Sequence, residues 1–199
     1  NRWGRVLLPA HPMTIHQEYG LPALPDALFE RGLFIANSYS GNTEETLDAL
    51  YAAEKRGISC AVIATGGELL AYAREKRMPY IAMPATGIQP RTAVGFNVKA
   101  LLRCIGAEPM LAEVSALATT LHPAEYEKAG TMLAKQCKGR VPVIYASQRN
   151  AALAYVWKIA MNETGKIPSF MNVVPELNHN EMTGFDVKPK SRHLSRQFY

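Results

Sequence analysis

The sequence predicts an α/β protein built of two doubly wound units, in which parallel sheets are flanked by helices. From residue 31 onward, short apolar runs alternate with amphipathic stretches, a pattern typical of strand-helix-strand units around a parallel sheet. The pattern begins again near residue 138, after a long helical stretch, which indicates a second unit. The 199 residues, 48% of them hydrophobic and 20% charged, suffice for one large domain or two small ones.

The first unit opens with an apolar run at 32–37 (GLFIAN), which is expected to form a buried strand. A turn at 38–41 follows. The stretch after it is predicted to be a helix, because four of its residues stand at helical spacing, namely Leu47, Leu50, Tyr51 and Glu54. Asn42, with Glu45 three residues later, has the pattern of a helix cap.

The rest of the first unit continues the alternation of strands and helices. We expect a second strand at 60–65 (CAVIAT), a short helix at 68–76 and a third strand at 80–83. Gly66 and Gly67, between the second strand and the helix, are interpreted as a turn.

A helical region connects the two units. It begins with an amphipathic helix at 90–106, which has proline at its start, and continues with helical stretches at 108–121 and 123–137. We therefore predict a first unit at 1–137, which includes these connecting helices, and a second unit at 138–199.

The second unit is expected to repeat the order of the first. An apolar run at 141–146 (VPVIYA) predicts a strand, and a helix follows from 150 to 163. A further apolar run covers 167–174, and the polar segment at 175–184 (PELNHNEMTG) comes directly after it.

Cysteine usage and hydropathy predict a soluble, cytoplasmic protein. Cys60, Cys104 and Cys137 are scattered singly, so neither a disulfide framework nor a zinc site is expected. No apolar run approaches the ~20 residues that cross a bilayer, and no basic stretch precedes an apolar one at the N-terminus. We therefore expect no membrane partner.

The formal net charge of +5 owes much to the last dozen residues. Lys188, Lys190, Arg192 and Arg196 stand close together there. A nucleic-acid contact would normally need interleaved aromatic residues or a recognised module, so we interpret this run as a solvated tail or the flank of an anionic pocket. No nucleic-acid partner is expected.

The turn after the first strand has the composition of a phosphate-binding site. Ser38, Ser40 and Thr43 lie between a strand and a helix, at the carboxyl edge of a parallel sheet, where α/β proteins bind ligands. Hydroxyls and free N–H groups at a helix start can surround a phosphate without a lysine. The same residues also favour ordinary capping turns. Glu44 and Glu45 must point away if a phosphate binds here.

The stretch SYSGNTEETLDAL closely resembles the phosphosugar-binding turn of SIS domains. The surrounding segments, from about residue 19 to residue 185, resemble the bifunctional phosphoglucose/phosphomannose isomerases. The resemblance implies two SIS-type units and makes Ser38, Ser40 and Thr43 the phosphate ligands. It also implies conversion of glucose 6-phosphate, and of mannose 6-phosphate, to fructose 6-phosphate through a cis-enediolate.

Such an isomerisation needs a group that moves a proton between C1 and C2. The segment Asn162-Glu163-Thr164-Gly165-Lys166 resembles the family segment that supplies the proton-transferring glutamate, which makes Glu163 the candidate. Family members more usually have an Asn-Ala pair where Thr164 and Gly165 stand. A surface glutamate at a helix end would have the same appearance.

Ring opening needs a group that exchanges a proton with the ring oxygen. The segment Pro175-Glu176-Leu177-Asn178-His179-Asn180-Glu181 closely matches the family's P-E-x-N-H-N-E, whose histidine opens the ring, so His179 is the candidate. A metal site is the alternative, but Glu176, His179 and Glu181 lack the spacing of a zinc site. We expect neither a metal nor a cofactor.

The enediolate needs a cation near its developing negative charge. Arg91, in Pro90-Arg91-Thr92-Ala93, resembles the family arginine that stabilises this intermediate. The alternative is a surface arginine at a helix start, where the helix dipole does not favour a cation.

The resemblance also implies a homodimer, since in this family the neighbouring subunit brings the ring-opening histidine. Family members carry a glycine-rich turn upstream and further helices downstream, so the first unit is expected to be incomplete at its N-terminus and the chain to be an interior fragment. Two alternatives remain open. One is a non-catalytic SIS module that senses phosphosugars, and the other is an aminosugar-phosphate isomerase.

Overall fold

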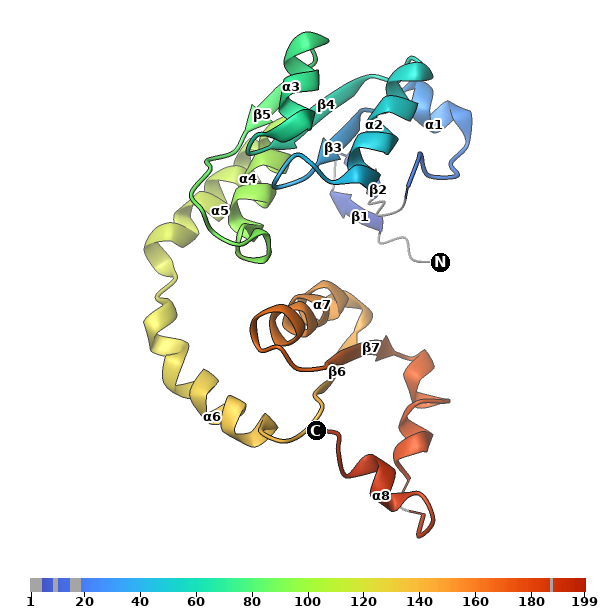
Figure 1. Cartoon of the computed structure of the whole chain (residues 1–199), viewed down its shortest axis with the longest axis vertical. Helices are drawn as coiled ribbons and strands as arrows, with labels where there is room; N and C mark the ends of the chain where they lie inside the picture. Colours follow the sequence, from blue (N-terminus) through green and yellow to red (C-terminus); the bar gives the residue numbers. More distant parts are fainter. Residues whose placement is uncertain (1–4, 9–10, 15–18, 187) are drawn as a thin grey trace. The chain divides into compact units, whose positions relative to one another are not determined.

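The computed structural model describes residues 5–8, 11–14, 19–186 and 188–199. The chain divides into two compact units, Asn1–Thr120 and Leu121–Tyr199. Each unit is an α/β arrangement with a parallel sheet and flanking helices, so the predicted fold class is confirmed (Figure 1).

The first unit is built on a parallel sheet of three strands in the order β3-β4-β5. These strands are β3 (Phe34–Asn37), β4 (Cys60–Ala64) and β5 (Tyr80–Ala82). Ala36 is paired with Val62 across the first two strands, and every residue of β4 is buried. All three strands lie within the apolar runs that predicted them.

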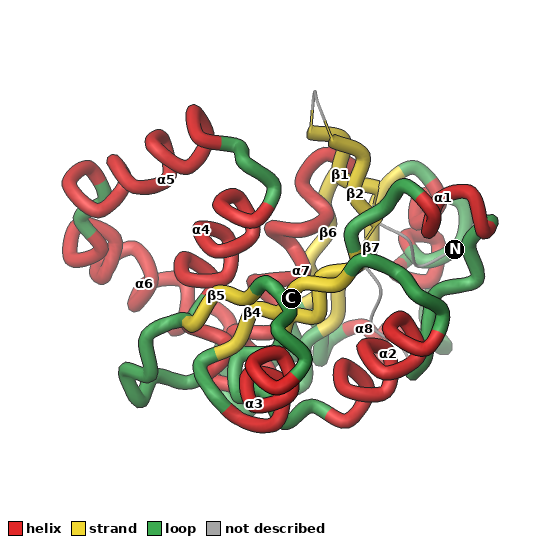
Figure 2. Tube along the Cα trace, turned by 90° about the horizontal axis from the view of Figure 1, so that it is seen from above, coloured by secondary structure: helices red, strands yellow, loops and turns green. Residues whose placement is uncertain are grey.

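Helices connect and cover these strands. The crossovers are α2 (Glu44–Lys55), between β3 and β4, and α3 (Gly67–Glu75), between β4 and β5. After β5 come the 3-10 turn η1 (Pro90–Thr92) and the helices α4 (Val94–Cys104) and α5 (Glu108–Thr120). Figure 2 shows β4 and β5 between α3 and α4.

Two apolar layers hold the first unit together. Side chains alternate between the faces of a strand, so β4 contributes Val62 to one layer and Ile63 to the other. On the first face, α2 and α3 supply fully buried leucines, which are Leu50 and Leu69. On the second face, Ile63 packs with Ala100 of α4. The core therefore lies on both sides of the sheet and fixes the strand ends that carry the connecting loops.

Smaller elements precede this sheet. A two-stranded antiparallel hairpin joins β1 (Arg5–Leu8) to β2 (His11–Thr14). The short helix α1 (Asp26–Glu30) leads into β3. These elements were not predicted, because none of them shows a clear periodicity or a continuous apolar run.

The second unit contains a parallel pair of strands, β6 (Val143–Ser147) and β7 (Phe170–Val174). Between them lie η3 (Gln148–Asn150), the helix α7 (Ala151–Ile159) and the π-turn η4 (Ala160–Thr164). Two 3-10 turns follow β7, η5 (Glu176–Asn178) and η6 (Met182–Phe185), and then the short helix α8 (Arg192–Ser195). Near the chain end, Phe198 bridges to Val141 beside β6.

The division between the units falls before the turn η2 (Pro123–Tyr126) and the helix α6 (Glu127–Cys137). Both lie in the first unit predicted from the sequence, 1–137. Contacts tie α6 to the second, because Cys137 is buried and Gln136 accepts a hydrogen bond from the Tyr199 hydroxyl at 2.7 Å. Among the helices of the described residues, none is both long and apolar enough to cross a membrane.

Candidate functional site

Three predicted site residues lie together in the turn after β3. The N–H of Ser38 extends the sheet by donating to the carbonyl of Ile63 (3.0 Å), and its side chain is buried. The hydroxyl oxygens of Ser38 and Thr43 are 2.6 Å apart. The Ser40 hydroxyl accepts the N–H of Asn42 at 3.2 Å. The turn therefore gathers the three predicted hydroxyl groups between β3 and α2.

The start of α2 adds backbone donors to this turn. Thr43 is the last residue before the helix, and its carbonyl accepts the N–H groups of Thr46 and Leu47 at 3.1 and 3.0 Å. The first N–H groups of a helix have no acceptor inside it and carry the positive end of the helix dipole. Hydroxyls and N–H donors of this kind are suited to bind the oxygens of a phosphate.

A second loop, after β4, holds the turn in place. Thr65 donates its N–H (2.9 Å) and its hydroxyl (2.7 Å) to the carbonyl oxygen of Tyr39. The two loops pack closely, so that a Cβ on Gly41 would lie 2.0 Å from the carbonyl oxygen of Gly66. The glycine pair that the sequence indicated as a turn therefore also supports the hydroxyl-rich turn.

Asn42 does not cap α2, and the predicted cap is wrong. No side-chain hydrogen bond caps the start of this helix. Instead, Oδ1 of Asn42 accepts the N–H of Glu68 at 2.9 Å, in the first turn of α3. The N–H groups at the start of α3 also lack acceptors inside their helix, and they are within reach of the Asn42 side chain. Sequence spacing along one helix does not reveal this competing donor.

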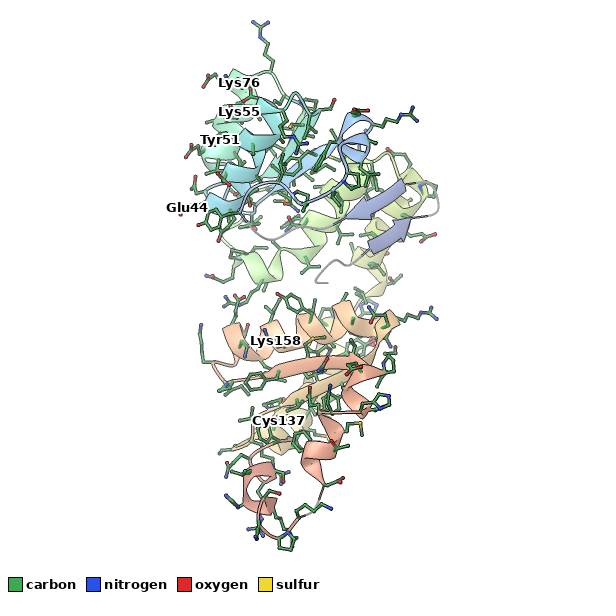
Figure 3. The ribbon with its side chains drawn as sticks, turned by 90° about the vertical axis from the view of Figure 1, so that its right-hand side faces the viewer. Glu44, Tyr51, Lys55, Lys76, Cys137 and Lys158 are labelled. Atoms are coloured by element: carbon green, nitrogen blue, oxygen red, sulfur yellow. The ribbon has the colours of Figure 1, made fainter. Side chains whose placement is uncertain are left out.

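Two carboxylates, Glu44 and Glu45, stand in the first turn of α2. The Tyr19 hydroxyl donates to Oε2 of Glu44 at 3.3 Å. The charge of Glu45, burial and the charge of Glu44 raise the pKa of Tyr19. The Tyr19 phenol, which lies outside the turn, therefore interacts with the negative charges at the start of α2. Figure 3 shows Glu44 and Lys55 at opposite ends of α2.

Arg91 is half-buried in η1, in the connection from β5 to α4. The N–H and the hydroxyl of Thr92 both donate to the carbonyl of Gln89, at 2.9 and 2.7 Å, and fix this turn. Because β3, β4 and β5 are parallel, the connections after them leave the sheet at one edge. The connection that carries Arg91 therefore begins at the same edge as the hydroxyl-rich turn.

Glu163 is exposed and belongs to the π-turn η4, which continues α7. The turn ends with a hydrogen bond from the N–H of Gly165 to the carbonyl of Ala160 (3.0 Å). A Cβ on Gly165 would lie 2.7 Å from the carbonyl oxygen of Met161, which explains why glycine suits this position. Single π-turns inside helices occur frequently at functional sites.

His179 is exposed and directly follows η5. Its N–H donates to the carbonyl of Glu176 at 3.0 Å, which closes the turn. Leu177, inside the turn, is fully buried and anchors the segment to the second unit.

Glu163 and His179 lie at opposite ends of β7. Glu163 precedes the strand, and the side chain of its neighbour Asn162 donates to the carbonyl of Ile167 at 3.0 Å, before β7 begins. His179 comes after the last residue of the strand. Figure 1 shows the end of α7 at one side of the sheet and the segment after β7 at the other. One copy of this unit therefore does not bring the two side chains together.

The structure thus brings together Ser38, Ser40 and Thr43. Arg91 belongs to the same unit as these residues, whereas Glu163 and His179 belong to the second unit. The described residues contain no group of three or more histidine, cysteine, aspartate or glutamate side chains that could hold a metal ion.

A hydroxyl-rich turn at the carboxyl edge of a parallel α/β sheet is the arrangement expected of a phosphosugar-binding SIS unit. Residues 127–196 match the family model of the bacterial phospho-glucose isomerase C-terminal SIS domain. The resemblance predicted from the sequence is confirmed.

Curated relatives extend the match over most of the chain. It is 32% identical to the bifunctional phosphoglucose/phosphomannose isomerase of Aquifex aeolicus over 87% of the chain and 53% of that protein. For the isomerase of the same name from Caldicellulosiruptor bescii, the identity is 34% over 87% of the chain and 54% of the relative. A D-glucosamine-6-phosphate 4-epimerase of Sulfolobus acidocaldarius is 31% identical over 74% of the chain and 49% of the relative. The chain spans about half the length of these relatives.

Solved structures share the fold. A glucosamine-6-phosphate deaminase from Thermotoga maritima superposes with a TM-score of 0.57 at 18% identity, over 88% of this chain and 59% of that one. A tagatose-6-phosphate ketose/aldose isomerase from Escherichia coli gives a TM-score of 0.53 at 18% identity, over 83% and 47% of the two chains.

Proposed function

We propose that the protein containing this chain is an aldose-ketose isomerase that interconverts glucose 6-phosphate and mannose 6-phosphate with fructose 6-phosphate. The observation that carries the proposal is the turn at Ser38, Ser40 and Thr43, held by a second loop in a chain related to such isomerases. The three hydroxyls and the N–H groups at the start of α2 bind the substrate phosphate.

Three further side chains perform the chemistry in this proposal. His179 opens the sugar ring by exchanging a proton with the ring oxygen. Glu163 moves a proton between C1 and C2, and the resulting cis-enediolate is stabilised by the guanidinium of Arg91. The exposure of Glu163 and its position in a π-turn support access to a substrate. The reaction requires no metal and no cofactor.

The enzyme acts as a homodimer with shared active sites. Glu163 precedes β7 and His179 follows it, so a site that uses both must combine them from different copies. A two-fold dimer supplies each residue twice and completes two equivalent sites.

The enzyme works in the cytoplasm, in glycolysis and gluconeogenesis. The three cysteines at 60, 104 and 137 are unpaired, which suits a reducing compartment. Sugar phosphates, the proposed substrates, are metabolites of central carbohydrate metabolism.

A coupled assay of the full-length protein tests the activity. Fructose 6-phosphate is the substrate, and glucose 6-phosphate and mannose 6-phosphate are followed as products. Formation of both supports the proposal. Absence of product combined with tight phosphosugar binding would favour a sensor, and turnover of glucosamine 6-phosphate alone would favour an aminosugar-phosphate enzyme, a class to which one relative points.

Glu163→Gln tests the proton-transfer role in the same assay. The substitution keeps the size of the side chain but removes its basic oxygen, so isomerisation is expected to fall by at least about 100-fold while phosphosugar binding persists. Glu113→Gln, at an exposed position of α5, is the matched control and is expected to retain full turnover. Near-normal turnover of Glu163→Gln would remove this residue from the mechanism.

A further inference from the structure

Glu181 joins the segment of His179 to two neighbouring strands. Tyr145 of β6 and Asn172 of β7 are direct partners in the strand register. Side chains of registered partners project from the same face of a sheet. The Asn172 amide donates to Oε2 of Glu181 at 2.6 Å, and burial together with the neighbouring Glu181 carboxylate raises the pKa of the Tyr145 phenol. Two polar side chains that stand side by side on the sheet therefore interact with one acid.

The Asn172 amide and the Tyr145 phenol are both available as donors to the Glu181 carboxylate. Asn172 is the polar residue of an otherwise apolar strand, and its Oδ1 accepts the N–H of Val173 at 2.9 Å, which leaves its amide hydrogens for Glu181. Burial and the hydrogen bond to Glu181 raise the pKa of Tyr145 to about 12. The phenol is protonated at physiological pH, as an ordinary tyrosine is, and can donate to Glu181.

The other acid of the segment holds it from the opposite side of His179. Oε1 of Glu176 accepts from the Asn180 amide at 2.9 Å, and the Glu176 carbonyl accepts the N–H of His179. The Oδ1 atom of Asn180 in turn accepts the N–H of Glu181 at 2.5 Å. His179 thus lies between two anchored acids, and the main chain on both sides of it is fixed.

We propose that Glu181 is a positioning residue for ring opening, which sets the orientation of His179 by anchoring its segment to the Tyr145–Asn172 pair. The inference rests on the proposed isomerase function and deepens it. Glu181 acts through His179, because its carboxylate is hydrogen-bonded to Asn172 of the sheet. The arrangement also gives both acids of the segment a role that requires no metal.

Anomer exchange of glucose 6-phosphate, measured by exchange NMR on the full-length enzyme, tests this role. The exchange requires ring opening but no proton transfer between C1 and C2. Glu181→Ala is expected to slow the enzyme-catalysed exchange by about 10- to 100-fold, as displaced catalytic groups do. The KM for the phosphosugar is expected to stay within about twofold, since the hydroxyl-rich turn is intact. Glu181→Gln keeps one acceptor oxygen and is expected to retain an intermediate rate.

Tyr145→Phe and Asn172→Ala each remove one donor and decide the question if Glu181→Ala does not fold. Each is expected to lower anomer exchange severalfold, and adding Asn172→Ala to Glu181→Ala is expected to cause little further loss, because both act through one contact. Tyr72→Phe removes a comparable phenol–carboxylate hydrogen bond, to Glu54 in the first unit, and is the matched control with an unchanged rate.

The outcomes separate the two proposals. If the unaltered enzyme isomerises fructose 6-phosphate and the folded Glu181, Tyr145 and Asn172 variants all exchange anomers at its rate, the positioning role is overturned and the isomerase stands. If the unaltered enzyme shows no isomerisation, the proposed function itself fails. A rise in KM with an unchanged maximal rate would also contradict the positioning role.

Discussion

Gly41 and Gly66 meet so closely that a Cβ on Gly41 would lie 2.0 Å from the carbonyl oxygen of Gly66. Gly41 also has a φ of +76°, a conformation that residues with a side chain rarely adopt. The hydroxyl-rich turn and the loop after β4 therefore fit together only because no side chain separates them. The shape of the candidate phosphate site depends on the second loop as much as on its own hydroxyls.

Gly41→Ala is expected to damage both stability and phosphate binding. The new methyl group must push the two loops apart, and the left-handed backbone adds strain, so the free energy of unfolding should fall by at least about 2 kcal/mol. The KM for fructose 6-phosphate should rise in the full-length enzyme. Urea unfolding and steady-state kinetics measure the two effects.

Gly95→Ala is the matched control for this substitution. Gly95 is exposed in α4, and a Cβ there meets no atom within 4 Å. Alanine is the better helix former, so stability should stay unchanged or rise by up to about 1 kcal/mol. Equal effects of the two substitutions on KM would contradict the role of the close loop contact.

The sheet and the main helices could be predicted because the spacing of their apolar residues reflects which side chains are buried. All of β4 is buried, and the apolar run at 60–65 expresses this directly. The hairpin of β1 and β2 was missed because neither strand is a continuous apolar run or alternates apolar with polar residues. The helices between the units were placed correctly, but their packing partner was not evident, since the contact of Gln136 with Tyr199 joins residues far apart in the chain.

The hydroxyls of the candidate site could be predicted, but the contacts that hold them could not. Ser38, Ser40 and Thr43 are close in sequence, so a local motif describes them. Thr65 donates to the carbonyl of Tyr39, and Asn42 accepts the N–H of Glu68. Both contacts join two loops that only the folded sheet brings together. The predicted cap at Asn42 failed for this reason, since a helix-start pattern considers one helix alone.

Tyr39→Phe is expected to stabilise the protein. The hydroxyl oxygen of Tyr39 is buried and has no hydrogen-bond partner among the described residues, while the ring packs against the apolar layer of Ile63. Removing an unpaired buried hydroxyl should raise the free energy of unfolding by about 1 kcal/mol. Thr65→Val, which removes a 2.7 Å hydrogen bond, should lower it by a similar amount. Urea unfolding of both variants measures the difference, and a loss of stability in Tyr39→Phe would show that this hydroxyl has a partner.

Two tyrosines in the first unit predict a loss of stability at alkaline pH. The hydrogen bond to Glu68, with burial second, raises the pKa of Tyr51 from 10.0 to about 12. The hydrogen bond to Glu54 likewise raises the pKa of Tyr72 to about 12. Because the folded-state pKa lies above the unfolded value, the contribution is complete below pH 10 and is lost as pH rises toward 12.

The free energy of unfolding should therefore fall across this pH window, and less steeply in the Tyr51→Phe/Tyr72→Phe double variant. Urea unfolding at successive pH values measures the slope, and ultraviolet absorbance of tyrosinate follows the ionisation itself. Tyr126→Phe, at an exposed position, is the control with an unchanged slope. Formation of both tyrosinates at pH 10 in the folded protein would contradict the prediction.

The positions of Glu163 and His179 at opposite ends of β7 predict that two inactive variants restore each other. In the full-length protein, Glu163→Gln and His179→Ala should each be inactive as homodimers. If one site takes Glu163 from one subunit and His179 from the other, the mixed dimer has one site with both substitutions and one intact site. Random mixing makes half of the dimers mixed, so isomerase activity should recover to about a quarter of that of the unaltered enzyme.

The measurement is isomerase activity after co-expression, or after unfolding and refolding the two variants together. No recovery, in a mixture shown by distinct tags to contain mixed dimers, would mean that each subunit completes its own site.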